Sequence, residues 1–175
     1  MSITIRSGLE TDATALAELA AQTFAETFAA NTSDEDMALY LAEAYGTPQQ
    51  LQELLDPDIT TLLVECDGDL AGYAMLRPGD APDCVIGESP IELWRFYIAS
   101  AWHGRGLAQA LMLRAELEAQ RRGARTLWLG VWERNLRAKA FYSKCGFTDV
   151  GSHVFVVGTD PQTDRIMARQ LPGDQ

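Results

Sequence analysis

The segment His103–Ala108, HGRGLA, constrains this chain most, because it joins a predicted strand directly to a predicted amphipathic helix. The strand covers residues 91–100, and the helix runs from Gly104 to Gly123. Gly104 and Gly106 let the backbone turn sharply and approach a ligand without an intervening Cβ. The unpaired N–H groups and the dipole at a helix start favour an anion such as pyrophosphate. Short glycine motifs also occur in turns that bind nothing, so these residues alone leave both interpretations open.

Two other nucleotide-binding motifs do not fit this segment. A Walker loop needs the pattern GxxxxGK[ST], which the chain lacks. A dinucleotide-binding fingerprint needs a third small residue at a set spacing and an acid about twenty positions later. Gln109 stands at the position of that small residue, and the region around Arg125 is basic. Both kinds of site are therefore set aside.

The hydrophobic patterns predict a mixed α/β protein. Short apolar or alternating runs predict strands at residues 3–6, 59–66, 70–78, 91–100, 126–132, 147–158 and 164–171. Apolar spacings of three and four predict helices at 9–30, 31–46, 48–55, 104–123 and 135–146. The turn 67–69, Asp-Gly-Asp, predicts a hairpin, and segment 78–90, rich in Pro, Gly and Asp, predicts a loop. With no repeat or linker, 175 residues predict a single domain over 1–175.

Charge is distributed unevenly along the chain. The formal net charge of −11 argues against a nucleic-acid partner, which needs a basic surface. Residues 95–144 nevertheless hold ten of the fourteen Lys and Arg and only three acids. The other residues hold twenty-two acids and four bases. We expect the basic half to face an anion, and the acidic half either to attract cations or simply to keep the protein soluble.

Cysteine and histidine usage gives no sign of a metal site. Cys66, Cys84 and Cys145 are far apart and form no CxxC pair, as is typical of reduced thiols. His103 and His153 have no acid at metal-binding spacing beside them. The apolar runs are too short to cross a bilayer, and the first residues do not resemble a secretory signal. We therefore expect a metal-free cytoplasmic protein with no membrane partner.

Two motifs resemble those of the GNAT superfamily of N-acetyltransferases. His103-x-x-Gly106-x-Ala108 resembles its [Q/R]xxGx[G/A] pyrophosphate motif, and residues 135–147, NLRAKAFYSKCGF, resemble its Asn…Tyr…GF helix. His103 departs from the usual Gln or Arg, which matters little where backbone groups bind the phosphates. Segments 23–46 and 151–167 resemble the PaiA group of polyamine N-acetyltransferases, so that the likeness covers nearly the whole chain.

The resemblance implies a fold, a cofactor and an activity. The fold is a central mixed sheet, splayed near its fourth and fifth strands, with acetyl-CoA in the gap and the acceptor in the opposite mouth. The activity is acetyl transfer to the primary amine of a small molecule, with a polyamine such as spermidine as the leading acceptor. Alternatives are a protein N-terminus, an amino-acid-like amine, or a non-catalytic acyl-CoA sensor; a homodimer is compatible with each. The implied acetyl-CoA contacts are Phe96, Tyr97, Ile98, His103, Gly104, Arg105, Gly106, Leu107, Ala108, Asn135 and Tyr142.

Tyr142 is the candidate proton donor to the departing thiolate. It follows Asn135 by seven residues, or two helical turns, so both side chains share one face. With the family motif in register, a catalytic role is preferred over simple packing like that of Phe141. Asn135 is open to two interpretations, as an ordinary helix N-cap or as a contact to the pantetheine arm.

Glu92 is the candidate base, because an amine with a pKa of about 10.4 is almost fully protonated at neutral pH. On the predicted strand Glu92, Trp94, Phe96 and Ile98 share one face, and apolar neighbours would raise the pKa of the carboxyl. A chain of waters is the alternative base, and Glu133 is a weaker one.

The remaining candidates are assigned by position. Basic residues around the two helix starts could meet the phosphates of coenzyme A; these are Arg105, Arg134, Arg137, Lys139 and Lys144. Trp102, Trp128 and Trp132 are expected to pack or form a rim. His153 is expected to pack in the last hairpin, with a substrate-loop role as the alternative. The acids Asp34–Asp36, at a helix start, are expected at the mouth where the amine enters.

Overall fold

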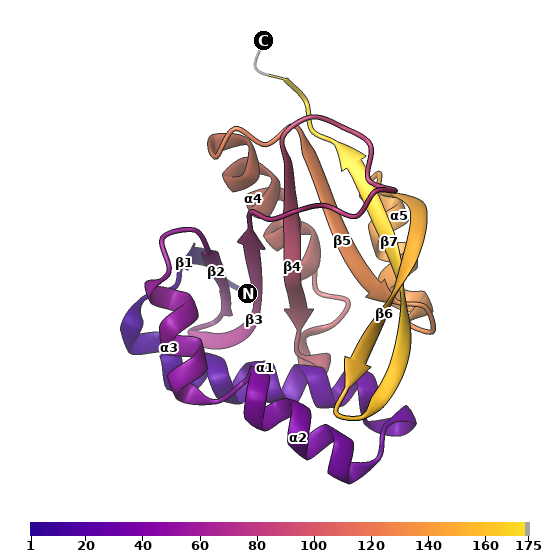
Figure 1. The fold of residues 1–175 in the computed structure, drawn as a ribbon. Coiled ribbons are helices and arrows are strands. Elements are labelled where there is room, and N and C mark those ends of the chain that lie inside the picture. The colour runs from indigo at the N-terminus through magenta and orange to yellow at the C-terminus, as the bar shows by residue number, and fades with distance from the viewer. Residues whose placement is uncertain (174–175) are drawn as a thin grey trace.

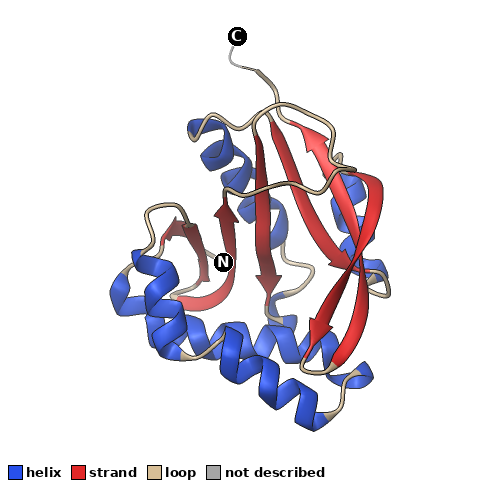
Figure 2. Cartoon of the chain, viewed as in Figure 1, coloured by secondary structure: helices blue, strands red, loops and turns tan. Residues whose placement is uncertain are grey.

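The computed structural model describes residues 1–173, which form one seven-stranded mixed sheet flanked by helices (Figures 1 and 2). The order across the sheet is β1-β2-β3-β4-β5-β7-β6. The strands are β1 (Ile3–Ser7), β2 (Thr60–Cys66), β3 (Asp69–Arg77), β4 (Pro90–Ile98), β5 (Thr126–Trp132), β6 (Thr148–Val157) and β7 (Asp160–Gln170). The helices are α1 (Ala13–Phe28), α2 (Asp34–Ala44), α3 (Thr47–Leu55), α4 (Leu107–Arg121) and α5 (Leu136–Lys144). The predicted mixed α/β class is confirmed.

Local sequence signals set the ends of these elements. Asp67 and Gly68 both have positive φ, 53° and 92°, as a two-residue hairpin turn requires, and they join β2 to β3. Ser33 caps α2, because its hydroxyl accepts a 3.1 Å hydrogen bond from the backbone N–H of Asp36. Pro48 lies in the first turn of α3, where its missing N–H breaks no helical bond.

Helices cover both faces of the sheet. α4 packs on one face against β2, β3 and β4, with Leu111 and Ala115 in the core between them. α1 packs on the other face against β3 and β4, with Leu16 and Phe24 in a second core. Figure 1 shows α1, α2 and α3 grouped at one end, below the strand ends of β4. Within residues 1–173, no helix is long and apolar enough to span a membrane.

The sheet divides between β4 and β5. These parallel strands are paired only at their beginnings, from Pro90–Glu92 on β4 to Thr126–Trp128 on β5. Beyond this point β4 continues to pair with β3, and β5 continues to pair with β7. Figure 1 shows the two strands moving apart toward their carboxyl ends. The predicted splay at the fourth and fifth strands is confirmed.

A β-bulge interrupts β4 at Trp94. Leu93 pairs with Leu76 and Arg95 pairs with Met75, so two steps along β4 match one step along β3. Trp94 is therefore the extra residue, and the alternation of side chains reverses at this point.

The bulge overturns one expectation about β4. Phe96 and Ile98 pack into the core under α4, whereas Trp94 packs into the core under α1. Glu92 lies between two residues that face α4, so its own side chain points to the α1 side, like Trp94. The expectation that Glu92, Trp94, Phe96 and Ile98 share one face is wrong, because an extra residue in a strand moves all later side chains to the other face.

Candidate active site

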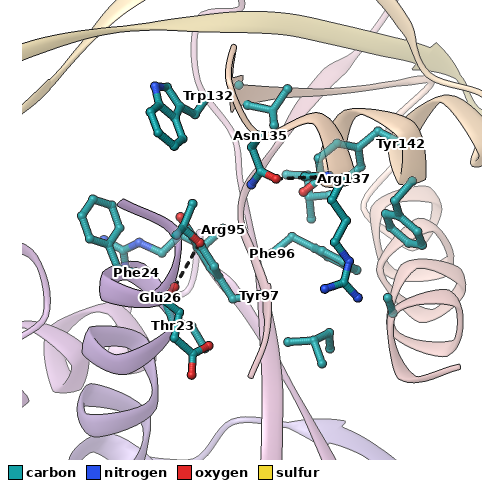
Figure 3. Close-up of a pocket in the computed structure, with 18 of the residues that line it drawn as sticks. Thr23, Phe24, Glu26, Arg95, Phe96, Tyr97, Trp132, Asn135, Arg137 and Tyr142 are labelled. Atoms are coloured by element: carbon teal, nitrogen blue, oxygen red, sulfur yellow. Dashed lines mark hydrogen bonds between the residues drawn. The ribbon is translucent and has the colours of Figure 1, made fainter. Parts of the chain in front are cut away.

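A cleft of about 940 Å³ opens where β4 and β5 separate. Because it passes through the sheet, its walls come from both faces: α4 and α5 on one side, and α1, α2 and the β6–β7 hairpin on the other. Figure 3 shows this arrangement, with Phe24 of α1 on one side of β4 and Tyr142 of α5 on the other. We call these the α4 end and the α1 end of the cleft.

The loop before α4, residues 103–108, has the backbone that a pyrophosphate site requires, and we call it the cradle. Gly104 and Gly106 have φ of 76° and 83°, and a Cβ added to either would meet no atom of the protein within 4 Å. Glycine is therefore required for backbone conformation rather than for internal space. His103, Gly104 and residues 106–108 all line the cleft, and the first N–H groups of α4 have no partner within the helix. The α4 end can thus hold a pyrophosphate.

His103 gives the unusual position in the motif a structural role. Its Nε2 lies 2.7 Å from the carbonyl oxygen of Ile98, which can only accept a hydrogen bond. The proton therefore sits on Nε2, and Nδ1 accepts a hydrogen bond from the guanidinium of Arg137. Through these two bonds, His103 ties the end of β4 and the first turn of α5 to the cradle.

The helix α5 brings Asn135 and Tyr142 to the same cleft, as their spacing predicts. Asn135 is the N-cap, and its Oδ1 accepts a 3.1 Å hydrogen bond from Ala138 N–H, the dashed line beside it in Figure 3. Its amide nitrogen takes no part in that bond. The capping interpretation is therefore correct, and it leaves a donor for a ligand.

Tyr142 is buried among aromatic rings but lines the cleft. Its ring packs edge-on against Phe96, Phe141 and Phe147, at centroid distances of 5.6–6.1 Å. Within residues 1–173, no hydrogen bond from a protein group acts on its hydroxyl. Burial raises the pKa of Tyr142, so the hydroxyl stays protonated at neutral pH.

The three expected contacts on β4 divide between the two faces. Phe96 stacks on Phe141 at 5.7 Å on the α4 side, and Ile98 lies on the same side. Tyr97 points to the α1 side and stacks on Tyr73 at 5.8 Å. All three β4 residues line the cleft. Only two of them can therefore offer a side chain to the α4 end.

The α1 end of the cleft is aromatic. Phe24 and Phe28 of α1 stack on each other, Tyr40 of α2 stacks on Phe24, and Phe28 lies 5.0 Å from Trp132. These four rings and Phe155 of β6 line the cleft. Trp132 was expected only to pack or form a rim; it is nine-tenths buried, and its Nε1–H donates a 2.9 Å bond to Gln162.

Two carboxylates of the cleft are already engaged. Glu92, the expected base, lies 2.6 Å from the guanidinium of Arg77, which also stacks on Trp94. Glu26 accepts hydrogen bonds from the N–H and hydroxyl of Ser100, both 3.0 Å. Although burial alone would raise it, hydrogen bonds from Gln22 and Ser100 lower the pKa of Glu26.

A third carboxylate, Asp164 of β7, was missed by the sequence interpretation. It is 8% exposed, and its Oδ1 has no hydrogen-bond partner in the described part of the chain. Burial raises its pKa to about 6. His153, which was expected to pack in the hairpin, lies on β6 beside it with Nε2 4.0 Å from Oδ2, and both residues line the cleft.

Charged residues reach the cleft less often than their sequence positions suggest. Arg134, Arg137 and Lys144 line it, whereas Arg105 lies over the ring of Trp102, 5.1 Å from its centroid, and is not on the wall. The expected basic half does not face the cleft as a unit.

Two other charged residues, Arg95 and Asp36, are engaged by partners of their own. Arg95 is buried in a 2.5 Å ion pair with Glu53 of α3, because the bulge turns it away from the α4 end. Asp34–Asp36 do not line the cleft. Asp36 instead accepts 2.7 Å hydrogen bonds from the N–H and hydroxyl of Thr159, which attach α2 to the β6–β7 turn.

Comparison with known proteins gives the same assignment as the geometry. Residues 15–147 match the Acetyltransferase (GNAT) family. An uncharacterised N-acetyltransferase of Lactobacillus delbrueckii subsp. lactis is 36% identical over 150 residues, which cover 86% of this chain and 87% of the relative.

Two proteins of Thermoplasma acidophilum are more distant. A spermidine N(1)-acetyltransferase is 28% identical over 151 residues, covering 84% of this chain and 89% of that protein. The crystal structure of a PaiA N-acetyltransferase in complex with coenzyme A superimposes with a TM-score of 0.79, at 26% identity over 97% of this chain and 99% of that one.

The match over residues 15–147, the splayed sheet and the glycine cradle at the start of α4 agree with one another. This chain belongs to the GNAT family and is an acetyl-CoA-dependent N-acetyltransferase.

Proposed function

We propose that this protein acetylates a primary amine of a small polyamine such as spermidine, by direct attack on acetyl-CoA with Tyr142 as general acid. The observation that carries this proposal is the cleft through the sheet. Its α4 end offers a helix start and a proton donor, and its α1 end offers aromatic rings and carboxylates.

The residues of the α4 end fit acetyl-CoA. The N–H groups at 104–108 and the start of α4 would hold the pyrophosphate. Asn135 has an amide donor for the pantetheine arm, and Arg137 and Lys144 add positive charge to the cleft wall. Acetyl-CoA supplies the activated acetyl group; binding, orientation and proton transfer belong to the chain.

The reaction needs a hydrogen bond to the thioester oxygen and a proton for the leaving sulfur. The bulge at Trp94 takes a backbone N–H out of the β3–β4 ladder beside the cleft, where it can bond the oxygen as negative charge develops. The amine nitrogen forms a bond to the carbonyl carbon and the carbon–sulfur bond breaks. Tyr142 gives its hydroxyl proton to the thiolate and recovers one from the amine nitrogen, by way of water.

The α1 end supports a polyamine as acceptor. Aromatic faces attract alkylammonium groups, and Phe24, Tyr40 and Trp132 present such faces here. Glu26, Glu92 and Asp164 add carboxylates at the same end. The likeness to a spermidine N(1)-acetyltransferase points to the same substrate class.

An amine panel tests the proposal. Purified protein, acetyl-CoA and a thiol reagent are combined with spermidine, spermine, putrescine, single amino acids and a peptide with a free N-terminus. We expect the highest kcat/KM for a polyamine, by at least about tenfold, which corresponds to roughly 1.4 kcal/mol. A preference for the peptide or the amino acids would replace the polyamine with those acceptors, and thiol release from no amine would leave an acyl-CoA sensor.

A further inference from the structure

Asp164 is the one carboxylate of the cleft, within the described residues, that neither an arginine nor a set of hydrogen bonds already holds. Glu92 is bound by Arg77 and Glu26 by Ser100. Asp164 is more than nine-tenths buried, yet its Oδ1 is unpartnered and the residue lines the cleft. An uncompensated buried carboxylate costs free energy, so its presence calls for a ligand that compensates it.

The neighbouring strand leaves room in front of Asp164. Gly130 of β5 faces the α1 end, and a Cβ added there would lie 3.1 Å from Asp164 Oδ2 and 3.3 Å from Cε1 of His153. The backbone of Gly130 has no conformation that demands glycine, since its φ is not in the left-handed region. Gly130 therefore serves to leave space, and this space lies beside the carboxylate of Asp164 and the imidazole of His153.

Groups facing Asp164 from the surrounding elements leave its charge unmatched. His153 of β6 is the nearest ionisable group, at 4.0 Å and with a side chain 42% exposed. The phenol of Tyr40 on α2 also interacts with it. β5 contributes Gly130 and Trp132, which carry no charge. A cation bound here would have the carboxylate as its strongest partner.

We propose that Asp164 receives the primary ammonium group of the acceptor and takes its proton, which makes it the base of the acetyl transfer proposed above. The balance is simple: one N–H bond of the ammonium breaks, and the proton joins the Asp164 carboxylate. The neutral nitrogen then attacks the thioester carbon, and Asp164 returns its proton to water past the partly exposed His153. This inference rests on the proposed amine acetylation and extends it by naming the residue that activates the amine.

Substitution of Asp164→Asn tests the proposal, since it keeps the shape and removes the charge. With spermidine, kcat/KM of the wild-type protein should rise with pH through about pH 6, because the carboxyl must be ionised to accept a proton. In the variant, kcat/KM should no longer rise through about pH 6. Near neutral pH it should be about 10²-fold lower than in the wild type. Acetyl-CoA affinity, measured by calorimetry, should stay within about twofold, because Asp164 lies at the α1 end.

Asp69→Asn is the matched control, an identical change on an exposed residue at the start of β3, and it should leave the pH profile intact. Retention of the pH 6 limb in Asp164→Asn would overturn the proposal. The proposal would also be overturned if Glu92→Gln or His153→Asn removed the pH 6 limb and Asp164→Asn kept it.

Binding separates this proposal from the proposed function. Spermidine is titrated by calorimetry into the complex with coenzyme A, which requires no turnover. Wild-type protein should bind at least about tenfold more tightly than Asp164→Asn. If the wild type acetylates no amine, the proposed function fails. The difference in spermidine affinity between the two proteins then still tests whether Asp164 binds an ammonium group. Equal affinities, or no binding by either protein, would remove Asp164 from that role.

Discussion

Asp164 should reduce stability at neutral pH, because its carboxylate charge is buried in the folded protein. Its pKa is about 6 in the folded protein, against an ordinary value of 3.8. Between these pH values the folded state binds more protons than the unfolded state, so stability falls as pH rises through that window. We expect the stability of Asp164→Asn relative to wild type to be greater near pH 7 than near pH 4, by on the order of 2–3 kcal/mol.

Urea unfolding of both proteins at the two pH values measures this difference. The free-energy cost of burying the Asn amide is the same at both pH values, so it cancels in the comparison across pH. Hydrogen bonds from arginine lower the pKa values of Asp12 and Asp149, and such groups destabilise the fold in acid. This effect is common to both proteins, so it cancels in the comparison between them. A stability difference that does not change with pH would mean that the pKa of Asp164 is the same in the folded and the unfolded protein.

Tyr142→Phe removes one hydroxyl and keeps the packed ring. If Tyr142 protonates the thiolate, the turnover number should fall about 10²-fold, while acetyl-CoA affinity is retained. Steady-state kinetics and calorimetry measure the two quantities. Tyr73→Phe is the control, because Tyr73 is also fully buried but does not line the cleft. Activity of Tyr142→Phe within about twofold of wild type would reduce the residue to packing.

The sequence predicts which candidate residues lie together where local spacing sets their relative positions. The seven-residue interval from Asn135 to Tyr142 and the glycines of the cradle depend only on the helices to which they belong. Asp164 has no such signal. It becomes recognisable only when the sheet pairs it with Trp132 on one side and His153 on the other, since those positions are far apart in the chain.

The start of α4 offers an internally controlled test of the cradle. Gly106 before α4 and Gly123 after it have nearly equal φ, 83° and 81°, and an added Cβ meets no protein atom at either position. Valine should therefore destabilise the fold at both sites through the same backbone strain, by about 1–2 kcal/mol. Only Gly106→Val should weaken acetyl-CoA binding, by at least about tenfold, because its side chain projects where the pyrophosphate approaches.

Thermal unfolding and calorimetry on the two valine variants separate strain from ligand contact. Equal losses of acetyl-CoA affinity would attribute the effect to strain in α4. A folded Gly106→Val protein with unchanged affinity would place the pyrophosphate elsewhere.

The positions of strands and helices along the chain followed from periodicity, but the facing of β4 did not. Strict alternation holds only for a regular strand, and the insertion of one residue at Trp94 depends on the pairing with β3 rather than on any local sequence signal. The bulge sends Arg95 into an ion pair with Glu53 and turns Phe96 toward Tyr142. The local sequence therefore encodes where a strand or helix lies, whereas the register of a strand depends on its pairing with a neighbouring strand.

Charge at the scale of the whole molecule was only partly predictable. The sequence divides into a basic segment and an acidic remainder, but folding neutralises Arg95 and uses Asp36 to hold the β6–β7 turn. Local counts cannot show which charges become paired. The net charge of −11 is unaffected by this pairing, and it acts on any cation that approaches the protein.

The single domain over 1–175 stays a prediction.

This net charge predicts a salt dependence that distinguishes polyamines from monoamines. Spermidine carries several positive charges, so its attraction to an anionic protein should weaken as the Debye length shrinks from about 10 Å at 0.1 M salt to about 3 Å at 1 M. We expect kcat/KM for spermidine to fall steeply with ionic strength, mainly through KM, and more steeply than for a monoamine of similar length. Saturating acetyl-CoA is needed in both series, because coenzyme A binding is itself salt-sensitive. Equal slopes for the two amines would show that the acceptor is not selected by its charge, and would favour an amino-acid-like or N-terminal amine.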